Sequence, residues 1–461
     1  MKFPTLRDIS QAYLRRELSP VEVVRASLDR IEAINPKINA IYHVDREGAL
    51  KTAAESERRW REGSSLSPFD GIPMSIKDAL PAIGMPIYRG SAAEQGVIAD
   101  TDHPTVARFR EAGGVILGKN TMCDYGILAS GNSSRHGVTR NPRNTNWNTG
   151  ASSSGAAAAV AAGIEPVSIG TDIVGSIRIP ASYCGLVGLK PSRGRVPYHF
   201  PNHPALVAGP LARNVHDAAM LLALLAHPDA RDFTALPPEH HDYAESLEDV
   251  DPAGVRIAVL PDLGLGATTA PSVRAGIEAA AAVLRTAGSD VRSISEAPFS
   301  PEDLDPIELH YLVRCFSEFR RARADLQQRS PFILEWTRRG EELSAADYYD
   351  SWNATQRLRE RTYRLMDDVD FLLVPSTADT AFEADRLAPE GQTAFSLWAP
   401  TCLFNLTEQP AASLPWGTDA AGKPIGLQIV GRRFDDRGVL RLSRYLERHA
   451  PDLADASCDT S

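Results

Sequence analysis

The chain has 461 residues, of which 43% are hydrophobic and 23% charged, and its formal net charge is −10. This balance is typical of a globular protein with a substantial core, and it excludes wholesale disorder, collagen and fibrous repeats. An acidic surface repels phosphate backbones and anionic lipids, so we expect no nucleic-acid or membrane partner. No stretch reaches the roughly 18–20 apolar residues of a membrane span, and the charged N-terminus lacks a signal-peptide core. We therefore expect a soluble, cytoplasmic protein.

The first half of the chain alternates helices and strands. Apolar residues at helical spacing predict two helices within residues 5–34 and a third from Asp45 to Arg61. A turn and a short buried strand are expected over 70–80, then a helix over 104–113 and a strand over 115–119. Residues 130–155 have the composition of a flexible linker, but they lead directly into a helix of small residues (156–163) and a strand (167–172). The alternation indicates an α/β protein.

The second half begins with a polar segment, residues 228–253, which we interpret as a surface excursion. The pattern beyond it predicts a strand (255–260), a helix (271–287), a strand (290–294), two long helices (302–327 and 344–367), two strands (370–376 and 426–432) and a final helix (435–448).

Lys77 is the first candidate for chemistry, because it stands in an apolar segment, GIPMSIKDAL. Lysine is almost never buried without a partner, so one interpretation is a strand-end lysine that reaches solvent or pairs with Asp78. The other is a buried lysine that acts as a base. A free lysine titrates near 10.4, and burial that lowers its pKa by about 3 would bring it to neutral pH.

Two clusters of serine and glycine are the second candidate. The segments GASSSG (150–155) and DIVGSIR (172–178) each place serine beside glycine. A helix cap and a tight turn would explain them structurally. Alternatively, successive backbone N–H groups at such a turn can stabilise an oxyanion while a serine attacks a carbonyl. The sequence contains no G-x-S-x-G elbow, S-x-x-K, Walker A or H-E-x-x-H motif, and the five cysteines form no CxxC pair. These absences disfavour the other common hydrolase, nucleotide and zinc sites.

The same segments resemble the amidase-signature family of serine hydrolases. The chain reads GASSSG, GTDIVGSIRIP and CGLVGLKP between residues 150 and 191, and GIPMSIKD around Lys77. TRNP (139–142), NLTEQPAASLP and PIGLQIVGR match the family as well. The resemblance covers most of residues 5–450 and is weakest between about 228 and 370. Several ordered motifs at consistent spacing make it specific.

The resemblance implies an α/β fold with a large twisted mixed β-sheet flanked by many helices in a single compact domain. Within it we expect an N-terminal helical segment (1–65), an amidase core with the catalytic motifs (66–227), a variable part that shapes the substrate pocket (228–370) and a C-terminal part of the same domain (371–461). It implies no metal or organic cofactor.

The resemblance also assigns a Ser–cis-Ser–Lys triad. Carried onto this sequence, Ser176 is the nucleophile, Ser152 is the bridging serine after a cis peptide, and Lys77 is the base. The backbone N–H groups of Ile173, Val174, Gly175 and Ser176 would form the oxyanion hole. Asp172 and Arg178 would brace this loop without forming part of the triad, and Ser153 would form a hydrogen bond near Lys77. Pocket candidates are Met122, Cys123, Asp124, Tyr125 and Trp398.

Some positions depart from the family pattern, and Val174 is the most informative of them. It stands where the family usually has glycine, and a β-branched residue disfavours positive φ. The loop is therefore either unstrained at this position or reshaped, with the valine narrowing the acyl pocket. Ala151 and Ser154 also replace glycines, Thr149 stands where proline is common, and Glu408-Gln409 interrupts a stretch that is usually apolar.

We expect an amidase that hydrolyses a small-molecule carboxamide or N-substituted amide. An amidotransferase subunit that passes ammonia from glutamine to a partner is the alternative within the family. Ile179 follows Arg178, where the tRNA-dependent amidotransferase subunit would have glutamine. This difference argues against the amidotransferase alternative. Two other functions stay open, namely a non-catalytic binding protein on the same fold and the cleavage of esters or carbamoyl-type bonds. Assembly as a homodimer stays open as well.

Overall fold

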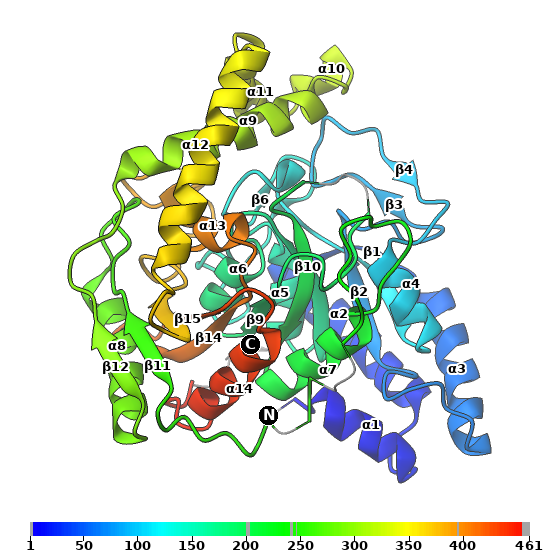
Figure 1. Ribbon diagram of the computed structural model, residues 1–461. Coiled ribbons are helices and arrows are strands. Elements are labelled where there is room, and N and C mark those ends of the chain that lie inside the picture. Colours follow the sequence, from blue (N-terminus) through cyan, green and yellow to red (C-terminus); the bar gives the residue numbers. More distant parts are fainter. Residues whose placement is uncertain (1–2, 200–202, 240–242, 246, 394–395, 454–461) are drawn as a thin grey trace.

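The computed structural model describes residues 3–199, 203–239, 243–245, 247–393 and 396–453. Its centre is an 11-stranded mixed sheet with helices on both faces (Figure 1). This confirms the predicted α/β fold with a large mixed sheet in one compact domain. In order across the sheet, the strands are β1 (Ile41–Val44), β5 (Val115–Asn120), β2 (Pro73–Lys77), β8 (Val167–Asp172), β10 (Val207–Ala212), β9 (Val187–Lys190), β14 (Ala411–Thr418), β15 (Pro424–Gly431), β13 (Phe371–Pro375), β11 (Arg256–Val259) and β12 (Asp290–Ser293).

Two short hairpins lie outside this sheet, and fourteen α-helices are found in the described residues. The hairpins are β3 (Pro86–Ile87) with β4 (Val97–Ile98), and β6 (Asn132–Ser133) with β7 (Gly137–Val138). The helices are α1 (Leu6–Leu14), α2 (Pro20–Ile38), α3 (Arg46–Glu62), α4 (Pro104–Glu111), α5 (Ser154–Ala161), α6 (Arg178–Cys184), α7 (Val215–Leu225), α8 (Pro271–Thr286), α9 (Asp305–Phe319), α10 (Ala324–Gln327), α11 (Pro331–Arg338), α12 (Ala345–Arg364), α13 (Ala399–Leu406) and α14 (Asp436–Glu447).

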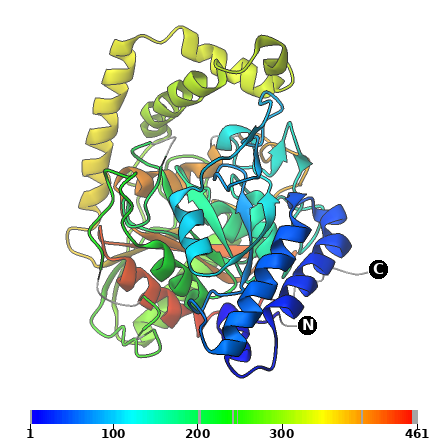
Figure 2. The same cartoon turned by 90° about the vertical axis from the view of Figure 1, so that its right-hand side faces the viewer.

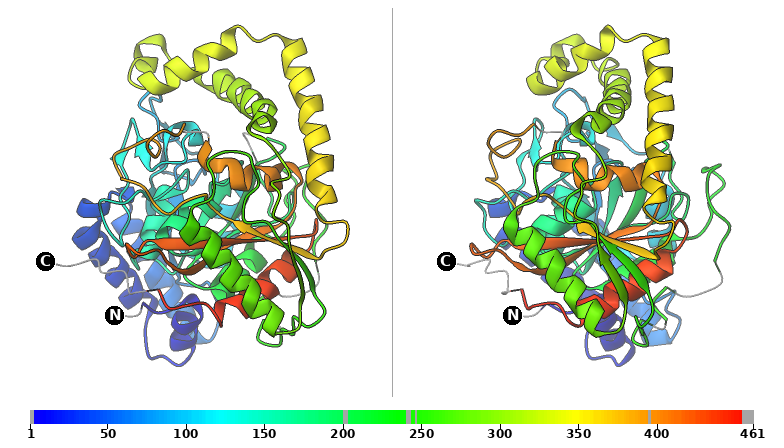
Figure 3. Two further views of the ribbon diagram at one scale, coloured as in Figure 1. Left: turned by 90° about the vertical axis from the view of Figure 1, so that its left-hand side faces the viewer. Right: turned by 60° about the vertical axis from the view of Figure 1, so that its left-hand side comes forward.

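Both faces of the sheet are covered by apolar clusters. In β13, Phe371 and Leu373 belong to the cluster shared with α7, α8 and α14, whereas Leu372 and Val374 belong to the cluster shared with α9, α11 and α13. Successive side chains of a strand point to opposite faces, so these two clusters lie on opposite sides of the sheet. Figure 3 shows α8 and α14 along one face and α13 on the other.

The pairing of β2 with β8 positions the candidate site. The two strands are parallel, with Ile76 opposite Ile169, so their carboxyl ends meet at one edge of the sheet. Lys77 is the last residue of β2, and the second serine cluster follows β8 directly. In open α/β sheets, ligands bind beyond the carboxyl ends of parallel strands. The sheet therefore brings Lys77 to this serine cluster from 99 residues away in the sequence.

Helix α5 begins within the first serine cluster, at Ser154, and is buried along its whole length. Its residues are small because the helix packs tightly: a Cβ on Gly155 would lie 2.4 Å from the carbonyl oxygen of Ala40 and 2.4 Å from the backbone nitrogen of Thr121. The apparent linker of residues 130–155 thus leads from exposed turns into the core, where Ser152 and Ser153 are buried.

The expected helix over 302–327 is wrong in its extent. A 3-10 turn (Pro301–Leu304) precedes α9, and the chain then breaks before the short α10. The side chain of Gln327 caps the end of α9, because its Nε2 donates to the carbonyl oxygens of Phe319 and Ala322 at 3.3 and 2.9 Å. Carbonyl groups in the last turn of a helix lack the α-helical partner four residues further on. Helices α9 to α12 form an arm that extends from one end of the molecule (Figure 2).

Candidate active site

Lys77 is completely buried and contacts three hydroxyl groups. Its Nζ donates to Ser152 Oγ at 2.9 Å, to Ser153 Oγ at 2.9 Å and to Thr171 Oγ1 at 2.8 Å. Burial lowers the pKa of Lys77 to about 7, against a smaller opposing effect of Cys123, Asp172 and Asp78. The ammonium form is disfavoured because it is removed from water, so the side chain is poised to exchange a proton near neutral pH.

The first serine cluster leads into α5, which begins at its Ser154. The peptide bond from Ala151 to Ser152 is cis. Ser153 joins three segments: its hydroxyl accepts from Lys77 and from the N–H of Thr171 at 3.3 Å, and its own N–H donates to the carbonyl oxygen of Ser176 at 3.2 Å. These contacts place Ser153 beside Lys77 and attach one serine loop to the other.

The second serine loop is built around Asp172. One carboxylate oxygen accepts from the N–H of Gly175 at 2.7 Å, and the other accepts from the N–H of Ile177 at 3.1 Å. Arg178 contacts the same carboxylate with two nitrogens, at 2.9 and 3.0 Å. Burial alone would raise the pKa of Asp172, but Arg178, Asn405 and Lys190 together lower that pKa to about 2. The aspartate is therefore a permanent anion that shapes the loop.

Sequence reasoning missed the other partners of Arg178. Its Nη1 donates to the carbonyl oxygen of Thr401 at 2.9 Å and to Gln428 Oε1 at 2.7 Å, and its Nη2 donates to Asn405 Oδ1 at 2.5 Å. Asn405 and Gln428 both lie in segments that carry the family resemblance, NLTEQP and PIGLQIVGR. Those motifs were the available signal, but nothing in them indicated contact with Arg178.

The Arg178→Met variant is expected to lose about 3–5 kcal/mol of unfolding free energy, because it leaves Asp172 as an unpaired buried charge. Arg58→Met is the matched control, since the ion pair of Arg58 with Glu62 is solvent-exposed and worth at most about 1 kcal/mol. Denaturant unfolding of both variants checks this. Equal losses in the two variants would contradict the structural role of the buried pair.

The predicted oxyanion loop is unstrained at Val174, which is one of the two alternatives that the sequence left open. Val174 does not adopt positive φ; within this loop Gly175 does, at +136°. The N–H of Gly175 already donates to Asp172, so it is not free to bind a substrate oxygen. Within the described residues, the N–H groups of Val174 and Ser176 have no hydrogen-bond acceptor. The valine is therefore accommodated without strain, and the glycine is required at the next position.

Gly175→Ala is expected to destabilise the protein by about 1–3 kcal/mol and to disturb the loop. The added Cβ would lie 2.2 Å from Thr401 Oγ1 at a φ that L-residues rarely adopt. Gly422→Ala is the control, because Gly422 has φ +80° but no atom within 4 Å of the new Cβ. Thermal unfolding compares them; a Gly175 variant no less stable than the Gly422 variant would contradict the close contact.

A cleft with about 540 Å³ of empty space, including its opening to solvent, lies beside both serines. Ser152 and Ser176 line it and are 4% and 6% exposed. Two of the five predicted pocket residues, Met122 and Tyr125, line it as well. Its remaining lining residues are Ala79, Arg89, Gly126, Thr171, Ile173, Tyr198, His203, Leu206, Tyr311, Arg314 and Glu318.

The other three predicted pocket residues do not line this cleft in the described structure. Cys123 is buried, and its Sγ contacts the carbonyl oxygen of Leu128 at 3.2 Å. Asp124 accepts hydrogen bonds from the N–H of Ser134 and from Ser330 Oγ, which anchors the start of α11. Trp398 is 1% exposed and packs in the apolar cluster beneath α9. Packing and hydrogen bonds within the protein therefore explain the positions of these three side chains.

Charged side chains line one side of the cleft. Arg89 forms an ion pair with Glu318, and Arg314 Nε lies 3.4 Å from Glu318 Oε1. Arg314 also donates to the carbonyl oxygen of Tyr125 at 2.7 Å. Asp78, next to Lys77, holds the loop that carries Arg89 by accepting from the N–H groups of Tyr88 and Gly90. This side of the cleft therefore carries the positive charges of Arg89 and Arg314 and the single negative charge of Glu318.

Within the described part of the chain, no cluster of three or more His, Cys, Asp or Glu side chains has the geometry of a metal site. No described helix is both long enough and apolar enough to cross a membrane. Four cysteines are free and buried, namely Cys123, Cys184, Cys315 and Cys402, and Cys458 lies outside the described residues.

Comparison with known proteins agrees with this fold. The family model described as Amidase matches residues 22–440. The chain is 32% identical to an acylamidase of Rhodococcus erythropolis, over 96% of this chain and 95% of that protein. It is 34% identical to a glutamyl-tRNA(Gln) amidotransferase subunit of Roseiflexus sp. (strain RS-1), over 96% of both chains. A crystal structure of a bacterial aryl acylamidase superposes with a TM-score of 0.88 at 28% identity, covering 97% of this chain and 96% of the other.

The fold and the family match thus define an α/β enzyme of the amidase family. The chain belongs to the amidase-signature family.

Proposed function

We propose that the protein is an amidase that hydrolyses a carboxamide or an N-substituted amide through an acyl-enzyme on Ser176. The observation that carries this proposal is the contact of buried Lys77 with Ser152, at 2.9 Å, in the cleft that Ser176 also lines. A serine needs a base to become a nucleophile, and a lysine with a pKa of about 7 can serve as one.

The chemistry begins with two coupled proton transfers. Neutral Lys77 takes a proton from Ser152 Oγ while Ser152 takes the proton of Ser176 Oγ. Ser176 Oγ bonds to the amide carbon, and the carbonyl oxygen becomes an oxyanion. The N–H groups of Ile173, Val174 and Ser176 stabilise it, and each such donor is worth about 2.7–4 kcal/mol in a preorganised site.

The C–N bond then breaks as the proton held by Lys77 returns through Ser152 to the leaving nitrogen. Water adds to the acyl-enzyme by the same route and releases the carboxylic acid and free Ser176. The two loops stay fixed throughout, because Asp172 holds one of them and the N–H of Ser153 joins it to the other. No step draws on a metal or an organic cofactor.

An amidotransferase role is the second candidate, favoured by the 34% identity to the amidotransferase subunit of Roseiflexus. Purified protein without a second protein chain should distinguish the two. We expect release of amine or ammonia from simple amides by the lone chain. Turnover confined to glutamine, and only with a co-purified partner protein, would contradict the free-standing amidase.

A further inference from the structure

Three charged side chains converge in the cleft that Ser176 lines, namely Arg89, Arg314 and Glu318. Glu318 forms the ion pair with Arg89, and its Oε1 lies 3.4 Å from Arg314 Nε, so one carboxylate stands between two guanidinium groups. The three side chains are 25%, 14% and 13% exposed, in the order named. We call Arg89 and Arg314 the arginine pair. Its charges are largely removed from water, yet they are accessible from the cleft.

The charges that line the cleft do not balance. The arginine pair carries two positive charges and Glu318 one negative charge, which leaves a formal charge of +1. Burial lowers the pKa of His203, so this lining residue is neutral. Glu94 accepts from the hydroxyl of Tyr125 at 2.8 Å, but it does not line the cleft. Charges with so little exposure are normally paired, and here one positive charge lacks a partner on a chain whose net charge is −10.

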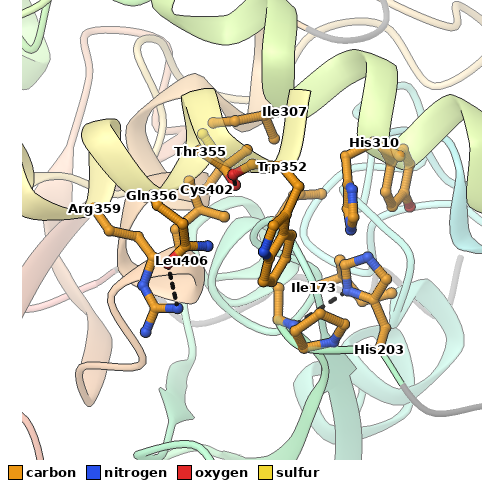
Figure 4. A pocket seen from close by; sticks show the side chains of 14 residues that line it. Ile173, His203, Ile307, His310, Trp352, Thr355, Gln356, Arg359, Cys402 and Leu406 are labelled. Atoms are coloured by element: carbon orange, nitrogen blue, oxygen red, sulfur yellow. Dashed lines mark hydrogen bonds between the residues drawn. The ribbon is translucent and has the colours of Figure 1, made fainter. Parts of the chain in front are cut away.

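The cavity next to the cleft supplies no negative charge either. It shares three lining residues with the cleft, Ile173, His203 and Tyr311. Among the described residues that line this cavity, Arg359 is the one with a permanent charge (Figure 4). Arg359 donates to Gln356 Oε1 at 3.3 Å and lies 3.3 Å from Glu408 Oε1, so its charge is already paired.

Aromatic rings hold the arginine pair in place. The guanidinium carbon of Arg89 lies 5.0 Å from the ring centroid of Tyr125, and that of Arg314 lies 4.9 Å from the ring centroid of Tyr311. Both rings line the cleft. The hydrogen bonds of the pair to Glu318 and to the carbonyl oxygen of Tyr125 each use an Nη2 group, whereas a guanidinium has five N–H donors. Both arginines therefore keep N–H groups for a ligand, in the planar arrangement that suits a carboxylate.

We propose that the arginine pair binds a carboxylate of the substrate while Ser176 attacks the amide. The proposal rests on the amidase function above, because it concerns the substrate of the same cleft. A carboxylate supplies the missing negative charge and accepts from the remaining N–H groups. A carboxamide of equal size supplies no charge and turns N–H groups of its own toward the guanidinium groups. The carboxylate belongs either to the acyl part or to the amine part of the substrate, and the test separates the two.

Calorimetry with the inactive Ser176→Ala protein measures binding without hydrolysis. The acyl-side probes are succinamate and glutaramate, each beside its diamide, and the amine-side probe is 3-acetamidopropanoate beside 3-acetamidopropanamide. At pH 8 Lys77 is mostly neutral, because burial lowers its pKa to about 7, so attraction of an anion is due to the arginine pair. We expect the carboxylate of one arm to bind at least about tenfold more tightly than its carboxamide.

Substitutions in the same background should change this preference in opposite directions. Arg89→Met and, separately, Arg314→Met each remove one positive charge, so we expect most of the preference to be lost while the affinity for the carboxamide stays within about twofold. Glu318→Gln removes the competing negative charge and keeps an oxygen that accepts from Arg89. It should therefore strengthen carboxylate binding several-fold.

Arg339→Met is the matched control for the change in total charge. Arg339 is paired with Glu308 at 2.9 Å, its side chain is 62% exposed, and it does not line the cleft. This variant should retain the preference for the carboxylate, because a solvent-exposed charge away from the cleft is screened by water and salt.

Several outcomes would overturn the proposal: no binding of any probe, equal affinities within every pair, or a preference that survives both arginine substitutions. Equal weakening of both members of a pair by Glu318→Gln would assign the three charges a merely structural role and overturn it as well. Failure of the proposed function is distinguishable. Carboxylate-selective binding without turnover by the wild type would remove the amidase and keep the anion site, whereas turnover of amides without a charge preference would do the opposite.

Discussion

Ser176→Ala should abolish amide turnover, with a loss of about 10⁴- to 10⁶-fold in kcat, while the protein stays folded. The variant lacks the oxygen that bonds to the acyl group, so only binding and the oxyanion donors are left. Removing one hydroxyl that is 6% exposed and lies at the cleft wall costs little stability. Steady-state turnover of an amide panel, with a thermal melt beside it, provides the measurement.

A fluorophosphonate makes the same test independent of the substrate. Peptide mass spectrometry should find a single adduct on Ser176 in the wild type and none in Ser176→Ala. Ser182→Ala is the matched control, because Ser182 is a buried serine of the adjoining helix α6 whose hydroxyl pairs with Thr377. It should label and turn over like the wild type. Turnover retained by Ser176→Ala would mean that the nucleophile is another group.

The parts of the site that could be predicted from the sequence are those in which neighbouring residues form the structure. The loop after β8 is such a case, because Asp172 holds the N–H groups of Gly175 and Ile177 only three and five residues away. A short motif contains all of that geometry, so a resemblance in the motif carries it over. The alternation of helices and strands was local as well, and most element bounds agreed to within a few residues.

The parts that could not be predicted depend on contacts between distant segments. Arg178 and Gln428 are 250 residues apart, and neither shows periodicity or spacing that would pair them. The same holds for Trp398, which looked available for a pocket but is buried against the apolar cluster of α9. The cavity next to the cleft is lined by His203 together with residues of α9, α12 and α13, so no single motif could reveal it.

Activity should rise with pH, with a midpoint near pH 7 in the profile of kcat/KM. Burial lowers the pKa of Lys77 to about 7, so the side chain is charged below that pH and neutral above it. Only the neutral amine accepts the proton from Ser152, which means that each pH unit below the midpoint costs about tenfold in rate. Above about pH 8 the profile should be flat until another group titrates.

Lys77→Met should lose about 10²- to 10⁴-fold of kcat/KM together with this midpoint, because the base is gone while its apolar stem is kept. Lys77→Arg should be comparably inactive, since a guanidinium stays protonated. A fixed positive charge at this position would be enough if Lys77 only braced Ser153 and Thr171. High activity in Lys77→Arg would therefore contradict the role of Lys77 as a base.

A second buried lysine offers a matched control for the origin of the midpoint. Burial lowers the pKa of Lys190 to about 7 as well, but Lys190 donates to the carbonyl oxygen of Pro191 and does not line the cleft. Lys190→Met should keep the midpoint near pH 7, even where its melting temperature differs from that of the wild type. A midpoint that disappears in Lys190→Met and persists in Lys77→Met would mean that the titrating group is Lys190. That result would contradict the role of Lys77 as the base.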